Sequence, residues 1–194
     1  MTLRDTHRNR RHAARGPLGA LLALVTLGAA STLSGCATSG DTVPACRDPL
    51  RLAVVAQSVP GASYLPCIRG LPPGWTTSGF DPSQHGTSFL LNSDRSPGQP
   101  VTVRLTTACR TSGASPSPAR APGVLTYTRL YSIRPRFAGR MYDVFPGGCV
   151  TYTFGVSHGS QIALMEQFKA AVGLYPRQQL RLLLKQELGV ELNP

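Results

Sequence analysis

The feature that most constrains this chain lies near its start, where a basic segment runs into a short apolar one. Residues 1–15 carry five arginines and one aspartate, Leu18–Thr32 has no charge, and the small residues Ser34 and Gly35 follow. An arginine costs roughly 2.5–3.5 kcal/mol in the middle of a bilayer, so the basic end should stay in the cytoplasm while the apolar stretch inserts. A stretch this short falls below the ~20 residues of a permanent helical span. The pattern predicts a secretory signal peptide.

The end of this stretch resembles a known processing motif. Leu33-Ser34-Gly35-Cys36 is similar to the lipobox of bacterial lipoproteins, where the signal peptide is removed and the new N-terminal cysteine is acylated. The resemblance covers residues 1–36 and implies that Cys36 carries fatty chains such as palmitate, held in membrane lipid on the extracytoplasmic face. An ordinary secreted protein and an uncut membrane anchor remain as alternatives.

Three segments follow from this prediction: a signal peptide over residues 1–35, an acylated tether over 36–45, and one extracytoplasmic domain over 46–194. The chain has a formal charge of +11, of which the part after residue 35 keeps +7, and eighteen of its twenty cationic residues are arginine. In composition, this arginine-rich leader, lipobox and Pro/Gly-rich domain resemble the uncharacterised lipoproteins of GC-rich Gram-positive bacteria. That resemblance assigns no catalytic or binding residue.

The remaining cysteines predict disulfide bonds. Once Cys36 is used by the anchor, an even number remains: Cys46, Cys67, Cys109 and Cys149. Thiols in an extracytoplasmic domain are typically paired. Four cysteines allow three pairings; we favour Cys46 with Cys67 and Cys109 with Cys149, because each pair closes a short loop. Metal binding is disfavoured, since no CxxC pair occurs and no histidine lies at ligand spacing from a cysteine.

The pattern of the domain predicts an α+β fold with an antiparallel sheet of about five or six strands. Asp48-Pro49 is typical of a helix start and Pro60-Gly61 of its end, which gives a short N-terminal helix. Turn residues separate six candidate strands, and Val101–Leu105 alternates most clearly between apolar and polar residues. The candidate strands are Trp75–Phe80, Thr87–Asn92, Val101–Ala108, Leu125–Tyr131, Met141–Phe145 and Cys149–Phe154.

Two C-terminal helices and one loop complete the prediction. Ile162, Met165, Phe168 and Val172 recur at helical spacing up to Gly173, and a second helix, with leucines on one face, runs from Pro176 to Gly189. Only two residues link these helices, and we expect their apolar stripes to cover one face of the sheet. Residues 111–123, TSGASPSPARAPG, are predicted to form a solvated loop with only alanine able to join a core.

Catalytic chemistry has little support. His158, in a predicted strand-to-helix turn, is the one residue that a small hydrolase would use, although an exposed turn histidine is the simpler interpretation. No G-x-S-x-G or phosphate-binding glycine motif occurs. We expect no cofactor and no metal, and nucleic acid is disfavoured because the domain is extracytoplasmic.

Charge segregation gives the candidate binding site. From Arg95 to Arg140 the chain holds eight arginines and no acidic residue, and Arg134, Arg136 and Arg140 are packed into nine residues. Guanidinium groups bind phosphate or carboxylate through forked hydrogen bonds, although a solvated loop would also hold them. We expect a non-catalytic envelope module whose partner is an anionic lipid, a wall polymer or an envelope protein. A structural partner of a membrane complex is the alternative. Arg177, Arg181 and Lys185 form a second stripe that the pattern explains as the wet side of the last helix.

Overall fold

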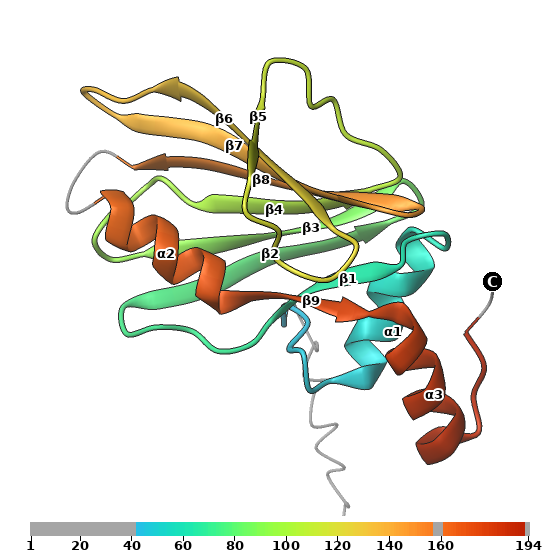
Figure 1. Cartoon of the computed structure of the whole chain (residues 1–194). Coiled ribbons are helices and arrows are strands. Elements are labelled where there is room, and N and C mark those ends of the chain that lie inside the picture. The colour runs from blue at the N-terminus through green and yellow to red at the C-terminus, as the bar shows by residue number, and fades with distance from the viewer. Residues whose placement is uncertain (1–41, 157–160, 193–194) are drawn as a thin grey trace, which may run out of the picture. The chain divides into compact units, whose positions relative to one another are not determined.

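The computed structural model describes residues 42–156 and 161–192. Short runs of apolar residues broken by glycine and proline give strands, and three longer runs at helical spacing give helices (Figure 1). The elements are α1 (Pro49–Ser58), β1 (Tyr64–Ile68), β2 (Trp75–Ser83), β3 (Gly86–Ser93), β4 (Val101–Thr106), β5 (Ser115–Ser117), β6 (Leu125–Ser132), β7 (Phe137–Phe145), β8 (Gly148–Val156), α2 (Gln161–Ala171), β9 (Val172–Pro176) and α3 (Arg177–Leu188).

The main sheet is antiparallel and has the strand order β2-β3-β4-β8-β7-β6-β5. The fold is therefore α+β, as predicted, and all six candidate strands are present as β2, β3, β4, β6, β7 and β8. The expected count of five or six strands was too low, because β5 adds a seventh strand. Its residues Ser115–Ser117 lie inside the segment predicted to be a loop and pair with Thr126–Thr128 of β6. The sequence of β5 has no alternation of apolar and polar residues that would predict a strand. It is a strand because it pairs with β6.

A second, two-stranded sheet joins β1 to β9. Cys67 lies opposite Gly173 and Leu65 opposite Tyr175. The two C-terminal helices are thus separated by a strand and not by a two-residue link, which corrects the prediction. Gly173 leaves room here for its neighbours, because a Cβ at this position would crowd the side chain of Arg69 and the sulfur of Cys46 and force them to shift. The strand could not be recognised locally, since its partner lies more than a hundred residues earlier in the chain.

The inner face of the main sheet is buried under α2, the β1–β9 pair and α1 (Figure 1). Alternate residues of β4, Val101, Val103 and Leu105, point inward and are almost fully buried, as their alternation predicted. Phe168 of α2 packs against the rings of Tyr152 and Phe154, with centroids 6.0 Å away in each case. The buried stripe of α2 is Leu164, Met165, Phe168 and Ala171. Ile162, expected in that stripe, is 76% exposed.

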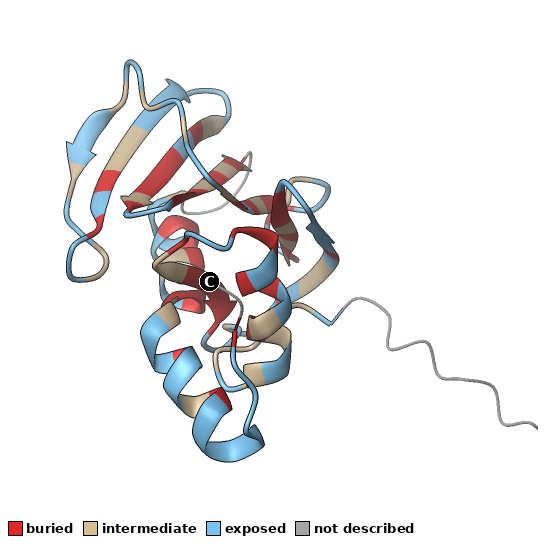
Figure 2. Cartoon of the chain, turned by 90° about the vertical axis from the view of Figure 1, so that its right-hand side faces the viewer, coloured by how far each residue is buried: buried red, intermediate tan, exposed pale blue. Residues whose placement is uncertain are grey.

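Helices α1 and α3 pack against each other beside the β1–β9 pair (Figure 1). The start of α1 follows the prediction, because the side chain of Asp48 accepts a hydrogen bond of 3.0 Å from the backbone N–H of Arg51. Helix α3 begins after Pro176 and ends at Gly189, whose φ of 64° is left-handed. Leu180 and Leu184 bury its apolar side. Much of the rest of α3 is exposed (Figure 2).

Two disulfides connect neighbouring parts of the domain. Cys46 is bonded to Cys67, with Cα atoms 5.0 Å apart, and Cys109 to Cys149, with Cα atoms 5.8 Å apart. This is the pairing that short loops favour. The first disulfide holds the segment before α1 against β1. The second ties the connection between β4 and β5 to β8, so that this connection is fixed as it passes to the far edge of the sheet.

Candidate anion-binding surface

The outer face of the sheet carries arginines at the end where β6 turns into β7. Strand alternation places Met141 and Asp143 of β7 on the inner face, beside Tyr152 and Val150 of β8, and therefore puts Arg140 on the outer face. Arg129 of β6 lies directly opposite Arg140 in the register. We call Arg129, Arg134, Arg136 and Arg140 the outer arginine surface. All four are exposed.

Tyr131 is the centre of this surface. The guanidinium carbon of Arg129 lies 5.3 Å from the centroid of the Tyr131 ring, and that of Arg140 lies 5.9 Å from it. Like charges directly opposite each other on a sheet are unfavourable, and an aromatic face partly offsets the cost. Arg129 also donates a hydrogen bond of 3.0 Å from Nη1 to the carbonyl of Ser112, which holds the β4–β5 connection. The two guanidinium groups are therefore positioned and remain exposed.

The other two arginines extend the surface along the hairpin. The side chain of Arg136 lies over Gly155: a Cβ added to Gly155 would be 3.6 Å from Nε of Arg136. Gly155 pairs with Ala138 and shares the outer face with Arg140. Arg134 lies in the turn between β6 and β7, where its carbonyl accepts a hydrogen bond from Ser132 Oγ. The structure thus brings the three predicted arginines to one end of one hairpin and adds Arg129 to them.

No carboxylate neutralises this surface in the part of the chain that the structure describes. The ion pairs there involve Arg95, Arg120, Lys169 and Lys185, and none of the four outer arginines. Tyr142 follows Arg140 by two residues in β7 and is buried. Burial raises the pKa of the Tyr142 hydroxyl, and hydrogen bonding to Tyr131 raises this pKa further, whereas Arg140 lowers it. The tyrosine thus stays neutral, and the surface is cationic over the ordinary pH range.

The acidic residue that ends the acid-free stretch, Asp143, is used elsewhere. It is fully buried on the inner face and forms an ion pair of 2.8 Å with Arg120. Its carboxylate also accepts hydrogen bonds from the hydroxyls of Thr126 at 2.8 Å and Tyr152 at 2.9 Å. Arg120 belongs to the segment predicted to be a solvated loop, and that prediction was wrong for this residue.

Arg120 also connects the sheet to the elements beneath it. Its Nη2 donates to the carbonyls of Lys169 at 2.8 Å and Val172 at 2.6 Å, where α2 ends and β9 begins. Its guanidinium lies 4.9 Å from the Tyr152 ring centroid. Burial disfavours the charged form, but Tyr152 and Asp143 outweigh it and raise the pKa of Arg120. Every charge in this cluster is compensated, so it is a structural network and not a site with a vacancy for a ligand.

The remaining predicted residues have different outcomes. Cys36 and His158 lie outside the residues that the structure describes. His85 is exposed in the turn between β2 and β3. Across residues 42–156 and 161–192, no three metal-ligating side chains come together, and no helix there is both long and apolar enough to cross a bilayer.

Comparisons with known proteins add no relative to this picture: no family model, no curated protein and no solved structure matched the chain. The fold and the site by themselves define a disulfide-bonded α+β domain that carries an arginine surface at one end of the β6–β7 hairpin. Among its site residues, sequence reasoning missed Arg129 and Tyr131. Their alternation in β6 was visible in the sequence, but their contact with Arg140 depends on the register of the hairpin.

Proposed function

We propose that this protein is a lipid-anchored, non-catalytic binding module of the cell envelope, which holds an anionic polymer on the outer arginine surface. The observation that carries the proposal is the grouping of Arg129, Arg134, Arg136 and Arg140 at one end of one hairpin, without a carboxylate partner among the described residues. Arg120, in contrast, is largely buried and is paired with the carboxylate of Asp143.

The shape of the surface favours a polymer over a single small anion. The four exposed arginines are spread over β6, β7 and the turn between them, so one anionic group would contact only part of them. Repeating phosphate or carboxylate groups would engage several guanidinium groups through forked hydrogen bonds. Tyr131 offers an exposed ring between two of the cations, against which the less polar part of a polymer unit would pack.

Two independent features support the envelope location. The lipobox at Leu33–Cys36 would place an acyl chain on Cys36, ten residues before the first disulfide cysteine. The disulfides Cys46–Cys67 and Cys109–Cys149 fit an oxidising compartment. The intact mass of the protein from a membrane fraction tests the anchor: we expect a chain that begins at an acylated Cys36, and a chain that begins at Met1 without added mass would contradict it.

Binding is tested with the anchored protein in nanodiscs of neutral phosphatidylcholine, using soluble poly(glycerol phosphate) as the probe. We expect the variant R134A/R136A/R140A to lose at least about tenfold in affinity, since each lost charged hydrogen bond contributes about 1.5–3 kcal/mol. The matched variant R134K/R136K/R140K keeps the charge and should bind with intermediate affinity, because lysine lacks the guanidinium fork. R47A/R69A removes charge from other exposed positions and should bind normally. Equal binding by all variants would contradict the proposal.

A further inference from the structure

Helix α1 has apolar residues on both of its sides. Its sequence, PLRLAVVAQS, holds one arginine and no acidic residue. Leu52, Val55 and Ala56 pack into the core, whereas Leu50 is 63% exposed and Val54 is 39% exposed. Leu50 and Val54 are four residues apart and therefore lie on the same outer side of the helix. A helix that is apolar all round is normally buried all round, so the outer side of α1 calls for a cover that the described domain does not supply.

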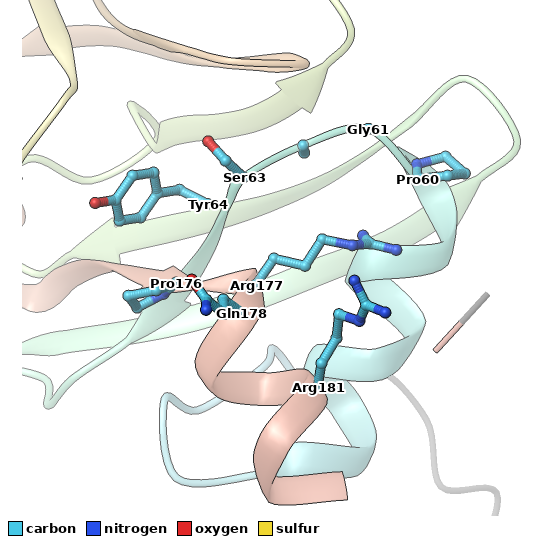
Figure 3. A pocket seen from close by; sticks show the side chains of 9 residues that line it. Pro60, Gly61, Ser63, Tyr64, Pro176, Arg177, Gln178 and Arg181 are labelled. Atoms are coloured by element: carbon cyan, nitrogen blue, oxygen red, sulfur yellow. The ribbon is translucent and has the colours of Figure 1, made fainter. Parts of the chain in front are cut away.

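Helix α3 adds exposed apolar residues next to those of α1. Figure 3 shows the two helices side by side, with Arg177 extended from the start of α3 toward α1. The Nη1 of Arg177 donates a hydrogen bond of 2.8 Å to the carbonyl of Ala56, near the end of α1. The helices are therefore antiparallel, and the end of α3 lies beside the start of α1. Leu188 and Val190, at that end, are 48% and 52% exposed. We call this set the α1–α3 face: Leu50, Val54, Leu188 and Val190.

The length of chain before α1 indicates what covers this face. The backbone is fixed to the fold at Pro44, whose carbonyl accepts a hydrogen bond of 2.8 Å from the N–H of Ile68, and at Cys46, whose N–H donates one of 2.9 Å to the carbonyl of Ile68. Pro44 follows Cys36 by eight residues, and a chain of that length spans at most about 30 Å. Helix α1 begins five residues after Pro44. An acyl anchor on Cys36 would therefore hold the start of α1 close to the bilayer.

The charged residues around the α1–α3 face suit a lipid–water interface. Arg47 is exposed immediately before α1, and Arg51 follows in its first turn. At the end of α3, Lys185 pairs with Glu191 at 3.0 Å, and Glu187 is exposed. Charges of both signs thus border the face, which makes it a poor site for an anion. Long cationic side chains at the border of an apolar surface reach the head groups while their methylene groups contact the apolar layer.

We propose that the α1–α3 face lies on the bilayer and inserts its apolar side chains between the lipid head groups. This inference rests on the lipid anchor proposed above and does not depend on the outer arginine surface. A bilayer suits the face better than a second protein, because the anchor would keep the face and the lipid at a high effective concentration. Apolar side chains that enter the head-group region need no directional partner, and burial of their surface supplies the attraction.

The test uses tryptophan fluorescence of the acylated protein, isolated from membrane and placed in nanodiscs of neutral phosphatidylcholine. The single tryptophan of the chain, Trp75, is buried and gives the background emission. L50W and L188W place an indole on the α1–α3 face, and I162W places one at an exposed position at the start of α2. When the lipid is brominated near the head-group end of its acyl chains, L50W and L188W should lose emission and I162W should keep it. Circular dichroism checks that each variant folds as the parent does.

The outcomes separate this inference from the function proposed above. Adding R134A/R136A/R140A to L50W should leave the quenching unchanged, because the outer arginine surface takes no part in it. A blue shift of L50W without quenching would mean that protein, such as a second copy of the chain, covers the face. That result, emission typical of water, or equal quenching of I162W would overturn the inference and leave the anchor in place. A chain without acyl mass on Cys36 would overturn the anchor and this inference together.

Discussion

The protein uses the same side chain in two opposite ways, and the contrast between Arg120 and the outer arginine surface shows what decides between them. The Arg120 side chain is 13% exposed and is bound to a carboxylate that is fully buried. Arg129, Arg134, Arg136 and Arg140 are exposed and have no carboxylate partner among the described residues. A charge removed from water needs a partner within the fold, whereas a charge left in water is free to bind a partner from outside.

The largest effect on stability is expected from variants that separate Arg120 from Asp143. R120M would leave the carboxylate of Asp143 buried without its cation, and D143A would leave the guanidinium without its anion. Each change should lower the free energy of unfolding by about 3–5 kcal/mol. The double variant R120M/D143A should cost clearly less than the sum, because no unpaired charge remains. Denaturant unfolding measures all three; R140A, which removes an exposed arginine, should fall within about 0.5 kcal/mol of the unaltered protein.

If R120M and D143A lowered the free energy of unfolding no more than R140A does, Arg120 would have to be solvated in solution. The contrast between the two sets of arginines would then have no basis.

The next effect concerns the disulfides that frame the two regions. Cys109–Cys149 closes a separation of 40 residues beside the outer face, and Cys46–Cys67 closes one of 21 residues next to β9. From loop-closure entropy, C109S/C149S and C46S/C67S should each lower the free energy of unfolding by about 3–4 kcal/mol. Thermal unfolding under non-reducing conditions measures both. If neither variant differed from the parent, the bonds would contribute nothing to stability and the support for an oxidising compartment would weaken.

A smaller effect should appear in alkaline solution, where the buried network titrates. Burial is the main reason that the pKa of the Tyr152 hydroxyl is raised; Arg120 opposes the shift and Asp143 adds to it. Because the folded-state pKa lies above the unfolded value of about 10, the stabilisation is complete below pH ~10 and is lost as the pH rises beyond it. The free energy of unfolding should therefore fall by up to about 1.4 kcal/mol per pH unit from this group.

Y152F removes this titration. Its unfolding free energy should be lower at neutral pH, since the hydrogen bond to Asp143 is lost, but it should decline less steeply above pH ~10 than that of the parent. Unfolding curves at several pH values between neutral and strongly alkaline measure the difference. Parallel declines in parent and variant would show that the Tyr152 hydroxyl is not shielded by the fold.

Local chemistry made much of the fold predictable. The Asp48 cap, the alternation of Val101–Leu105 and the turn at Pro146–Gly148 depend on residues that are close in sequence. At that turn Gly147 has a φ of 73°, and a Cβ there would overlap the backbone of Gly61. The six strands β2, β3, β4, β6, β7 and β8 followed from such signals. Strand β5 did not, because a Ser-Pro-Ser segment becomes a strand only by pairing with β6.

The sites were less predictable, for the same physical reason. The cluster of Arg134, Arg136 and Arg140 was visible as composition, but Arg129 joins it through a register that contains an irregularity between Leu130 and Ser132. The role of Arg120 depends on Asp143 and on carbonyls at the end of α2, which the sequence does not place next to it. Burial distinguished Arg120 from its neighbours, and burial is a property of the whole fold.

The claim that unpartnered arginines bind an external anion has one direct test. It is the affinity for poly(glycerol phosphate) of the anchored R134A/R136A/R140A variant relative to the unaltered protein, with both unfolding free energies measured alongside at ~0.15 M ionic strength. We predict a loss of affinity of at least about tenfold, with the unfolding free energies within about 0.5 kcal/mol of each other. Unchanged affinity in a variant that is fully folded would contradict the claim.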